Sequence, residues 1–235
     1  MGIGVMMIAH GLQMQLMGIR SVLEGFSVLT TGIFMSGYYV GYFIGSKTTP
    51  NFVSKVGHIR VFAAFASLAS LSALLAVVYV NPIMWTLSRF ITGVSLVSCY
   101  VVTESWLNDR ATNKNRGQLL SAYMMVIFFG LAIGMLLLNV SEPKNYEPFI
   151  LVSVLLSIAL VPILLTKRPA PKFKKIETIS IVELYKISPL GTFSSFFTGV
   201  IHAAFFSLIS VYATLAKLSL LETSVLLFIA TIAGV

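Results

Sequence analysis

Residues 50–60, Pro50-Asn51-Phe52-Val53-Ser54-Lys55-Val56-Gly57-His58-Ile59-Arg60, form a short basic stretch between two long apolar runs. The run before it, residues 32–49, is almost free of charge, and residues 61–80 after it contain no charged side chain. Two apolar runs of this length joined by a short positive segment are typical of a hairpin of membrane helices. We therefore expect a helix on each side of a loop at residues 50–60, and the charge of this loop fixes which side of the membrane it faces.

The composition is that of a membrane protein. Of the residues, 57% are hydrophobic and only 10% are charged, and the mean hydropathy is +0.92. Soluble proteins carry about 25% charged residues, so this chain cannot cover its surface in water and the lipid bilayer is its expected solvent. The net charge of +8 does not indicate nucleic-acid binding, because the basic residues lie in connections between apolar runs. Membrane lipids are therefore expected partners, and nucleic acid is not.

No enzyme chemistry is evident in the sequence. It has no phosphate-binding glycine loop, no metalloprotease helix motif and no nucleophile elbow. The one cysteine, Cys99, excludes an intrachain disulfide and a cysteine-based metal site, and three scattered histidines do not make a metal site. We therefore expect no catalytic residue, no cofactor and no bound metal.

The apolar runs predict an all-α, polytopic transmembrane protein. A spanning helix needs about 20 mostly apolar residues, and runs of that length are too long for the strands of a barrel. Seven runs qualify, and an eighth is cut short where the sequence stops. They lie at residues 2–19, 29–49, 60–80, 83–105, 118–138, 148–166, 189–213 and 221–235.

The positive charges predict the orientation of the helices. Twelve of the 16 Lys and Arg residues lie in or beside three alternate connections, at residues 47–60, 110–116 and 167–186. Cytoplasmic connections carry the excess of positive charge, so these connections and the N-terminus are expected to be cytoplasmic. The third connection is basic and contains prolines, which indicates a linker against an anionic leaflet. We expect three units: a six-helix half at residues 1–166, a linker at 167–188 and the start of a second half at 189–235.

The stretch at residues 50–60 resembles a signature of the major facilitator superfamily. That signature joins the second and third helices of the family and runs roughly G-x-L-x-D-R-x-G-R-R/K. Lys55 and His58 stand at two of its basic positions, Gly57 stands at its glycine, and Arg60 follows just beyond. The resemblance implies a contact on the cytoplasmic side of the membrane for this stretch.

The fourth apolar run carries a second match to the same family. Arg89-Phe90-Ile91-Thr92-Gly93 resembles the family's R-x-x-x-G motif, which is often linked to proton coupling. Residues 103–108, TESWLN, and 115–118, NRGQ, resemble the end of this helix and the next loop in a bacterial branch, the YcaD-like transporters. The resemblance covers essentially the whole chain. It implies secondary active transport of a small solute across the bacterial inner membrane by alternating access, with proton coupling as an option.

The family is built from twelve helices in two six-helix halves. The resemblance therefore implies that this sequence holds the first half and about two helices of the second, as a fragment or a truncated product. The alternative to a transporter is a non-transporting or inactive truncated membrane protein, or an interaction module. A membrane enzyme ranks behind both, because no polar constellation for catalysis is evident.

Two positions of the 50–60 stretch depart from the family signature. Pro50 replaces the leading glycine, and Ser54 replaces the acidic residue that helps latch the two halves together. Glu104, at the cytoplasmic end of the fourth run, is expected near Lys55 and Arg60 and is our candidate to replace that carboxylate. The alternative is a solvated carboxylate at a helix end.

Four polar side chains inside the apolar runs are candidates for a substrate or proton pathway. They are His10, Gln13, Arg89 and His202. Polar groups are costly in lipid, so we expect them to face the interior of the bundle, and either histidine could carry a proton near neutral pH. Structural roles are the alternatives: a buried histidine, an interhelical hydrogen bond of Gln13, and an Arg89 side chain that snorkels to the outer surface.

Glycines at four-residue spacing predict close packing of helices. They lie in the second and fifth runs, with one more in the fourth: Gly37, Gly41, Gly45, Gly130, Gly134 and Gly93. At the end of the first run, Arg20 and Glu24 have the i, i+4 spacing of an ion pair near the outer mouth.

Overall fold

The computed structural model describes residues 2–166 and 180–233, and every regular element in these two ranges is helical. The elements are α1 Gly2–Leu23, α2 Val28–Val56, α3 His58–Val78, α4 Pro82–Arg110, α5 Arg116–Leu136, the 3-10 turn η1 Leu137–Asn139, α6 Glu147–Ile158, α7 Val161–Leu164, α8 Ile181–Ile187, α9 Pro189–Leu215 and α10 Leu220–Ile232. The prediction of an all-α helical bundle is confirmed.

Each of the eight apolar runs contains a helix, but not every helix meets the requirements of a membrane span. In the part of the chain that the structure describes, six helical stretches are long and apolar enough to cross a membrane: α1, α3, α4, α5 with η1, α6 with α7, and α9. α2 has 29 residues, yet glycines and tyrosines lower its mean hydropathy. α10 has only 13 residues.

The prediction of a loop at residues 50–60 is wrong. α2 continues to Val56 and α3 begins at His58, so Gly57 alone joins the two helices. The φ angle of Gly57 is 86°, a conformation that glycine adopts without the steric penalty that a Cβ brings. A single residue is therefore enough to reverse the chain, and most of the basic stretch is helical.

Pro50 lies inside α2 rather than at its end. Proline removes one backbone N–H from the helical ladder, which weakens the helix at this point. Hydroxyl groups next to it donate to nearby backbone carbonyls: Thr49 bonds the carbonyl of Gly45 at 2.6 Å, and Thr48 bonds that of Ile44 at 3.0 Å. Both bonds lie in the turn before Pro50, and α2 continues through the proline to Val56.

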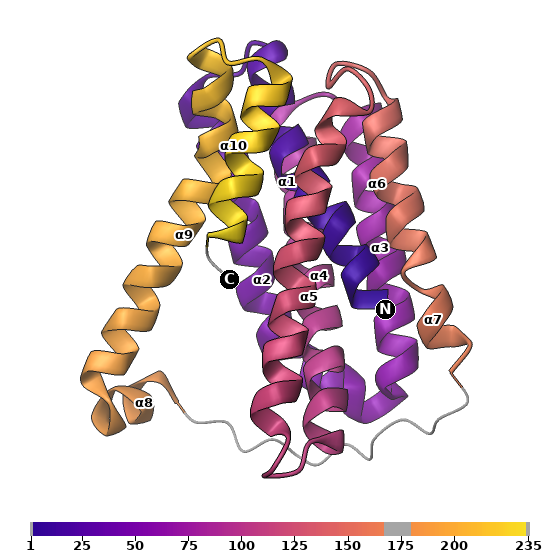
Figure 1. The fold of residues 1–235 in the computed structure, drawn as a ribbon, viewed down its shortest axis with the longest axis vertical. Coiled ribbons are helices and arrows are strands. Elements are labelled where there is room, and N and C mark those ends of the chain that lie inside the picture. The colour runs from indigo at the N-terminus through magenta and orange to yellow at the C-terminus, as the bar shows by residue number, and fades with distance from the viewer. Residues whose placement is uncertain (1, 167–179, 234–235) are drawn as a thin grey trace.

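The helices pack in sequence-distant pairs (Figure 1). α2 lies along α4, α1 lies along α5, and α3 contacts both α4 and α6. α1 is the central helix, since 83% of its most apolar window is buried inside the protein. α9 contacts α1 and α2 through its C-terminal part and leans away from the bundle towards α8 (Figure 1).

Glycines bring α2 and α4 into close contact. A Cβ added to Gly37 would lie 2.9 Å from the carbonyl oxygen of Thr86, and additions at Gly41 and Gly45 would also meet α4. Gly93 on α4 faces the backbone of α2 in return. The predicted G-x-x-x-G steps therefore lie in a helix interface that has no room for side chains.

The second glycine pair joins α5 to α1. A Cβ added to Gly130 would lie 2.7 Å from the Cβ of Met7, and one added to Gly134 would overlap the carbonyl oxygen of Ile8. This close approach holds the central helix against α5, so it also fixes where the polar side chains of α1 point.

The end of α1 is tied to the connection before α6. Arg20 is 8% exposed, and its Nε forms an ion pair with Glu24 at 2.6 Å, as predicted. Its Nη1 donates to the backbone carbonyls of Pro143, at 3.2 Å, and of Lys144. A charged donor shared among these acceptors fixes the α1 end of the bundle.

Of the predicted linker at 167–188, residues 167–179 lie outside the described residues. From residue 180 onward the chain forms α8, which starts with a reciprocal cap between Ser180 and Glu183. Tyr185 of α8 packs on Phe193 of α9 with ring centres 5.9 Å apart. Pro189 is the first residue of α9, where the sequence predicted that the next helix begins.

Candidate functional site

The main candidate site is a cavity of about 420 Å³ between six helices, α1, α2, α4, α5, α9 and α10. Its polar lining consists of two histidines, four tyrosines and one threonine: His10, His202, Tyr38, Tyr39, Tyr42, Tyr100 and Thr231. The remaining described lining residues are apolar or glycine, and none of the set is Asp, Glu, Lys or Arg. A cavity of this size and character is typical of a small-molecule site.

His10 enters the cavity from the middle of α1 and packs on α2. Its ring stacks on that of Tyr38, with centroids 5.3 Å apart and planes 20° apart. Its Nε2 lies 3.4 Å from the Tyr38 hydroxyl, within weak hydrogen-bonding distance. The Nδ1 atom is buried and has no hydrogen-bond partner among the described residues. One nitrogen of His10 is therefore available for a solute or a proton.

Four tyrosines form a cluster beside His10. The ring of Tyr38 lies 5.1 Å from that of Tyr39 and 6.0 Å from that of Tyr42, and Tyr42 lies 6.4 Å from Tyr100. Tyr39 also reaches α9, where its hydroxyl lies 3.3 Å from Ser207 Oγ. This cluster was not predicted, although the YYVGY sequence in α2 carries its signal: Tyr38 and Tyr42 are four residues apart and share a helix face.

Arg89 lies beside the cavity but does not line it. The side chain is fully buried, with 0% exposure, and its Cζ lies 4.9 Å from the centre of the Tyr38 ring. None of its three side-chain nitrogens has a hydrogen-bond partner in the described part of the chain. The snorkelling alternative is therefore wrong, because the packing of α4 against α2 and α3 holds this side chain inside the protein.

The other two pathway candidates have different surroundings. His202 lines the same cavity as His10, but from α9, and its ring lies 4.5 Å from that of Phe206. Gln13 is 1% exposed and lies outside the cavity lining, with an Nε2 that has no partner among the residues described. Gln15, which the sequence did not single out, bonds the carbonyl of Phe206 at 3.5 Å. The structure thus brings together His10 and His202, and leaves Gln13 buried outside the lining.

The predicted contact of Glu104 with the basic 50–60 stretch is not present. Glu104 accepts a hydrogen bond from the Tyr123 hydroxyl of α5 at 3.4 Å. Among the described residues the ion pair is between Arg20 and Glu24, so Glu104 does not pair with a basic residue there. Successive residues of a helix point about 100° apart, so Glu104 faces α5 while the next two residues face α3. Both Lys55 and Arg60 are exposed.

His58 makes the contact that was expected of Glu104. Its Nε2 lies 2.9 Å from Ser105 Oγ, and its ring stacks over that of Trp106 at 6.3 Å. His58 is 1% exposed and is the first residue of α3. The basic stretch is therefore joined to the end of α4 through the imidazole of His58.

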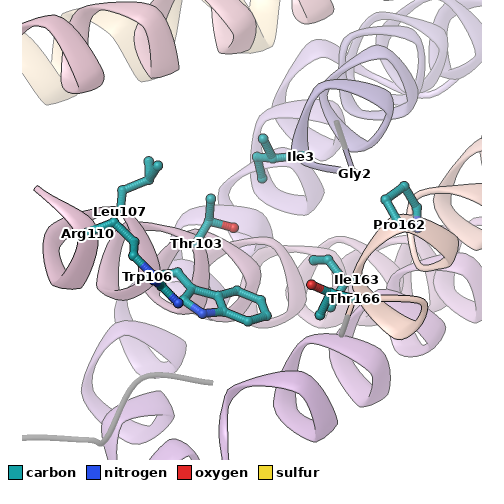
Figure 2. A pocket seen from close by; sticks show the side chains of 9 residues that line it. All are labelled: Gly2, Ile3, Thr103, Trp106, Leu107, Arg110, Pro162, Ile163 and Thr166. Atoms are coloured by element: carbon teal, nitrogen blue, oxygen red, sulfur yellow. The ribbon is translucent and has the colours of Figure 1, made fainter. Parts of the chain in front are cut away.

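A smaller pocket lies at the same end of the bundle (Figure 2). It has a volume of about 320 Å³ and is formed by the start of α1, the end of α4 and the α7 region. Figure 2 shows Trp106 and Arg110 of α4 on one side, with Ile163 and Thr166 across from them. Arg110 is the one charged residue of the described lining. Sequence reasoning did not single out this pocket.

The described residues do not bring together three or more metal-binding side chains. Cys99 is buried in α4, and its Sγ lies 3.8 Å from the carbonyl oxygen of Phe62. The cavity can therefore bind a solute through aromatic faces, imidazole nitrogens and the nearby charge of Arg89.

The comparisons with known proteins all point to the same family. Residues 1–235 match the family model described as Major Facilitator Superfamily. The chain is 26% identical over 185 residues to a protein of Escherichia fergusonii named "Uncharacterized MFS-type transporter YcaD", which covers 77% of this chain and 48% of that protein. Proteins of the same name from Escherichia coli strains HS and K12 are each 25% identical over 191 residues, or 80% of this chain and 50% of theirs. The chain thus spans about half the length of these relatives.

Proposed function

The chain belongs to the Major Facilitator Superfamily, and on that premise we propose that it takes part in moving a small solute across a membrane by alternating access. The observation that carries the proposal is the position of two histidines. His10 on α1 and His202 on α9 line the same cavity, although these helices lie on opposite sides of residues 167–179 in the chain. A cavity shared by helices from the two sequence halves is the place where a rocking transporter binds its solute.

The two sides of the cavity differ in how firmly they are packed. α1 is held by α5 through Gly130 and Gly134, whereas most of α9 is exposed and only its C-terminal part is buried. A helix with few buried contacts can change position at a low cost in free energy. Movement of α9 relative to α1 would open and close the cavity, with His10 and His202 on its two walls.

Proton coupling is the finer part of the proposal, and we assign it to His10. An imidazole can gain and lose a proton near neutral pH, and His10 Nδ1 has no partner among the described residues. Gln13, one turn along α1, and Arg89 complete the proposed pathway. A carrier that moves solute without protons remains the alternative, because none of the described residues that line the cavity carries a carboxylate.

The proposed location is the inner membrane of a bacterium, with the N-terminus and residues 167–188 in the cytoplasm. The positive charges of residues 47–60, 110–116 and 167–186 support this orientation. At that side, we assign Lys55, Gly57, His58 and Arg60 to a cytoplasmic contact that His58 anchors on α4. The latch role of Glu104 remains a proposal, with Tyr123 as its contact in this conformation.

Solute flux through the reconstituted protein tests the proposal. The 235-residue chain is placed in liposomes loaded with a mixture of small metabolites, and mass spectrometry follows which solutes leave and at what rate. We expect saturable loss of particular solutes, which His202→Ala slows and which Tyr79→Phe, a change at the far end of α3, leaves unchanged. Flux equal to that of protein-free liposomes would overturn transport by this chain and favour a non-transporting membrane protein.

A further inference from the structure

Among the described residues, none forms an ion pair or a hydrogen bond with Arg89. Its guanidinium is fully buried, and none of its nitrogens bonds a described residue. Moving a cation out of water carries a large cost in free energy even after relaxation, and a desolvated cation–π contact returns only part of it. The contact with Tyr38 therefore offsets only part of the cost, and an anion near Arg89 would offset much more.

Tyr38 connects this charge to the cavity. The tyrosine lines the cavity with its own side chain, and the guanidinium carbon of Arg89 lies 4.9 Å from the centre of its ring. Arg89 itself is not part of the lining. The Tyr38 ring thus contacts both the cavity and the guanidinium of Arg89.

The rest of the lining favours a flat, apolar body on that molecule. Tyr39, Tyr42 and Tyr100 present aromatic rings, and Phe128 and Phe206 add two more. Flat rings pack on such walls by offset stacking or edge-to-face contact. The four tyrosine hydroxyls and two imidazoles leave polar groups to orient the ligand.

From these contacts we propose that the cavity binds an organic anion with an aromatic or similarly flat apolar body, and that its anionic group pairs with Arg89 when the Tyr38 ring turns aside. This assignment rests on the proposed transport function, since it names the class of solute carried. A guanidinium donates two parallel hydrogen bonds to a carboxylate, which gives both strength and orientation.

The same contacts disfavour a cationic ligand. Aromatic cages bind cations, but Tyr38 already has Arg89 over its ring and His10 stacked on it. No Asp or Glu belongs to the described lining, so a bound cation would meet the arginine charge with no counterion. A neutral ligand can offer an oxygen acceptor to the guanidinium but cannot balance its charge.

Binding of three probes that share a benzene ring but differ in charge tests the charge that the site selects. The full chain is reconstituted in lipid nanodiscs, and calorimetry measures the binding of benzoate, benzamide and benzyltrimethylammonium. We expect benzoate to bind most tightly and Arg89→Gln to weaken it by roughly 10- to 100-fold, the range for loss of charge-assisted hydrogen bonds. Arg89→Lys keeps the charge and should retain part of the affinity. Arg110→Gln, at the other pocket, is the matched control and should change nothing.

The Tyr38→Ala variant tests whether the Tyr38 ring only covers Arg89 or is also a required part of the cavity wall. If the Tyr38 ring only covers Arg89, its removal leaves benzoate affinity equal or higher; if the ring is a required wall, affinity falls. Unchanged benzoate binding in Arg89→Gln, tighter binding of either other probe, or no binding of benzoate would overturn the proposal. Each variant is first checked for the unfolding temperature of the unaltered chain.

The two proposals fail in different ways. Flux of solutes in the liposome assay without benzoate binding would remove the anion assignment and leave transport intact. Benzoate binding that depends on Arg89, without flux of any solute, would leave the site and remove transport by this chain.

Discussion

The imidazole of His10 stacks on the phenol ring of Tyr38, with centroids 5.3 Å apart, and joins the central helix α1 to α2. The Tyr38 hydroxyl lies 3.4 Å from His10 Nε2, while His10 Nδ1 has no partner among the described residues. This pair places a group that can be protonated on the cavity wall, next to the buried charge of Arg89.

If His10 carries the coupled proton, His10→Gln separates solute flux from proton flux. Glutamine keeps a polar side chain on the cavity wall but cannot gain a proton near neutral pH. We expect solute flux in liposomes to continue without the pH change that a trapped dye records for the unaltered chain. Equal pH changes in both proteins would show that the proton takes another route.

Arg89→Met should stabilise the protein while it reduces solute binding. The arginine is fully buried without a hydrogen-bond acceptor, so a methionine of similar length avoids the desolvation cost, by about 1–4 kcal/mol in free energy of unfolding. Heating in detergent with a thiol-reactive dye measures this, because Cys99, the one cysteine, is buried until the protein unfolds. A lower unfolding temperature would mean that Arg89 has a partner that stabilises it.

Arg20→Met is the matched control and should lower the free energy of unfolding, whereas Arg89→Met should raise it. Arg20 is also largely buried, but it has an ion pair with Glu24 and donates to the carbonyl of Pro143. Loss of these charged hydrogen bonds should cost about 1.5–3 kcal/mol in free energy of unfolding. The two arginines thus test whether hydrogen-bond partners, rather than burial alone, decide the effect.

Gly41→Ala should destabilise the interface between α2 and α4. The added Cβ would overlap the carbonyl oxygen of Phe90, so the helices must move apart, at a cost of about 1–3 kcal/mol. Gly32→Ala, in the same helix, has nothing within 4 Å of its Cβ and should stabilise by about 0.5–1 kcal/mol, since alanine is the better helix former. Equal unfolding temperatures for the two variants would contradict the observed helix contact.

The cap of α8 should depend on pH. The backbone N–H of Ser180, and then its hydroxyl, bond the carboxylate of Glu183 and hold its pKa below the usual value for glutamate. A lowered pKa in the folded state means that the cap stabilises α8 at neutral pH and is lost as the pH falls through that pKa. The exchange rate of the 180–188 amides is divided by the rate in Glu183→Gln at the same pH. We expect this ratio to rise as the pH falls. Parallel rates in the two proteins would contradict the cap.

Much of the fold could be predicted from the sequence because its signals are local. Each of the eight apolar runs contains a helix, Pro189 marked the start of α9, and the glycine spacing marked the two close interfaces. The expected loop at residues 50–60 was not found, since α2 continues through Pro50 and a single glycine, Gly57, makes the turn.

The site was harder to predict because it depends on which helix faces meet. Helical spacing put His10 and Gln13 on one face, but could not decide that only His10 reaches the cavity. The depth of Arg89 in its helix left both burial and snorkelling open, and packing against Tyr38 decided between them. Glu104 turned towards α5 because of its angular position on α4, which a one-dimensional signature does not contain.

Chemical access to residue 202 tests alternating access most directly. A cysteine is introduced by His202→Cys, with Cys99 left in place because it is buried, and a membrane-impermeant maleimide is added to vesicles of each orientation. Lys114→Cys and Lys144→Cys, in connections at opposite ends of the bundle, report each face separately. We predict that Lys114→Cys reacts from the cytoplasmic face only, Lys144→Cys from the other face only, and His202→Cys from both. Reaction of His202→Cys from a single face, or from neither, would contradict the account.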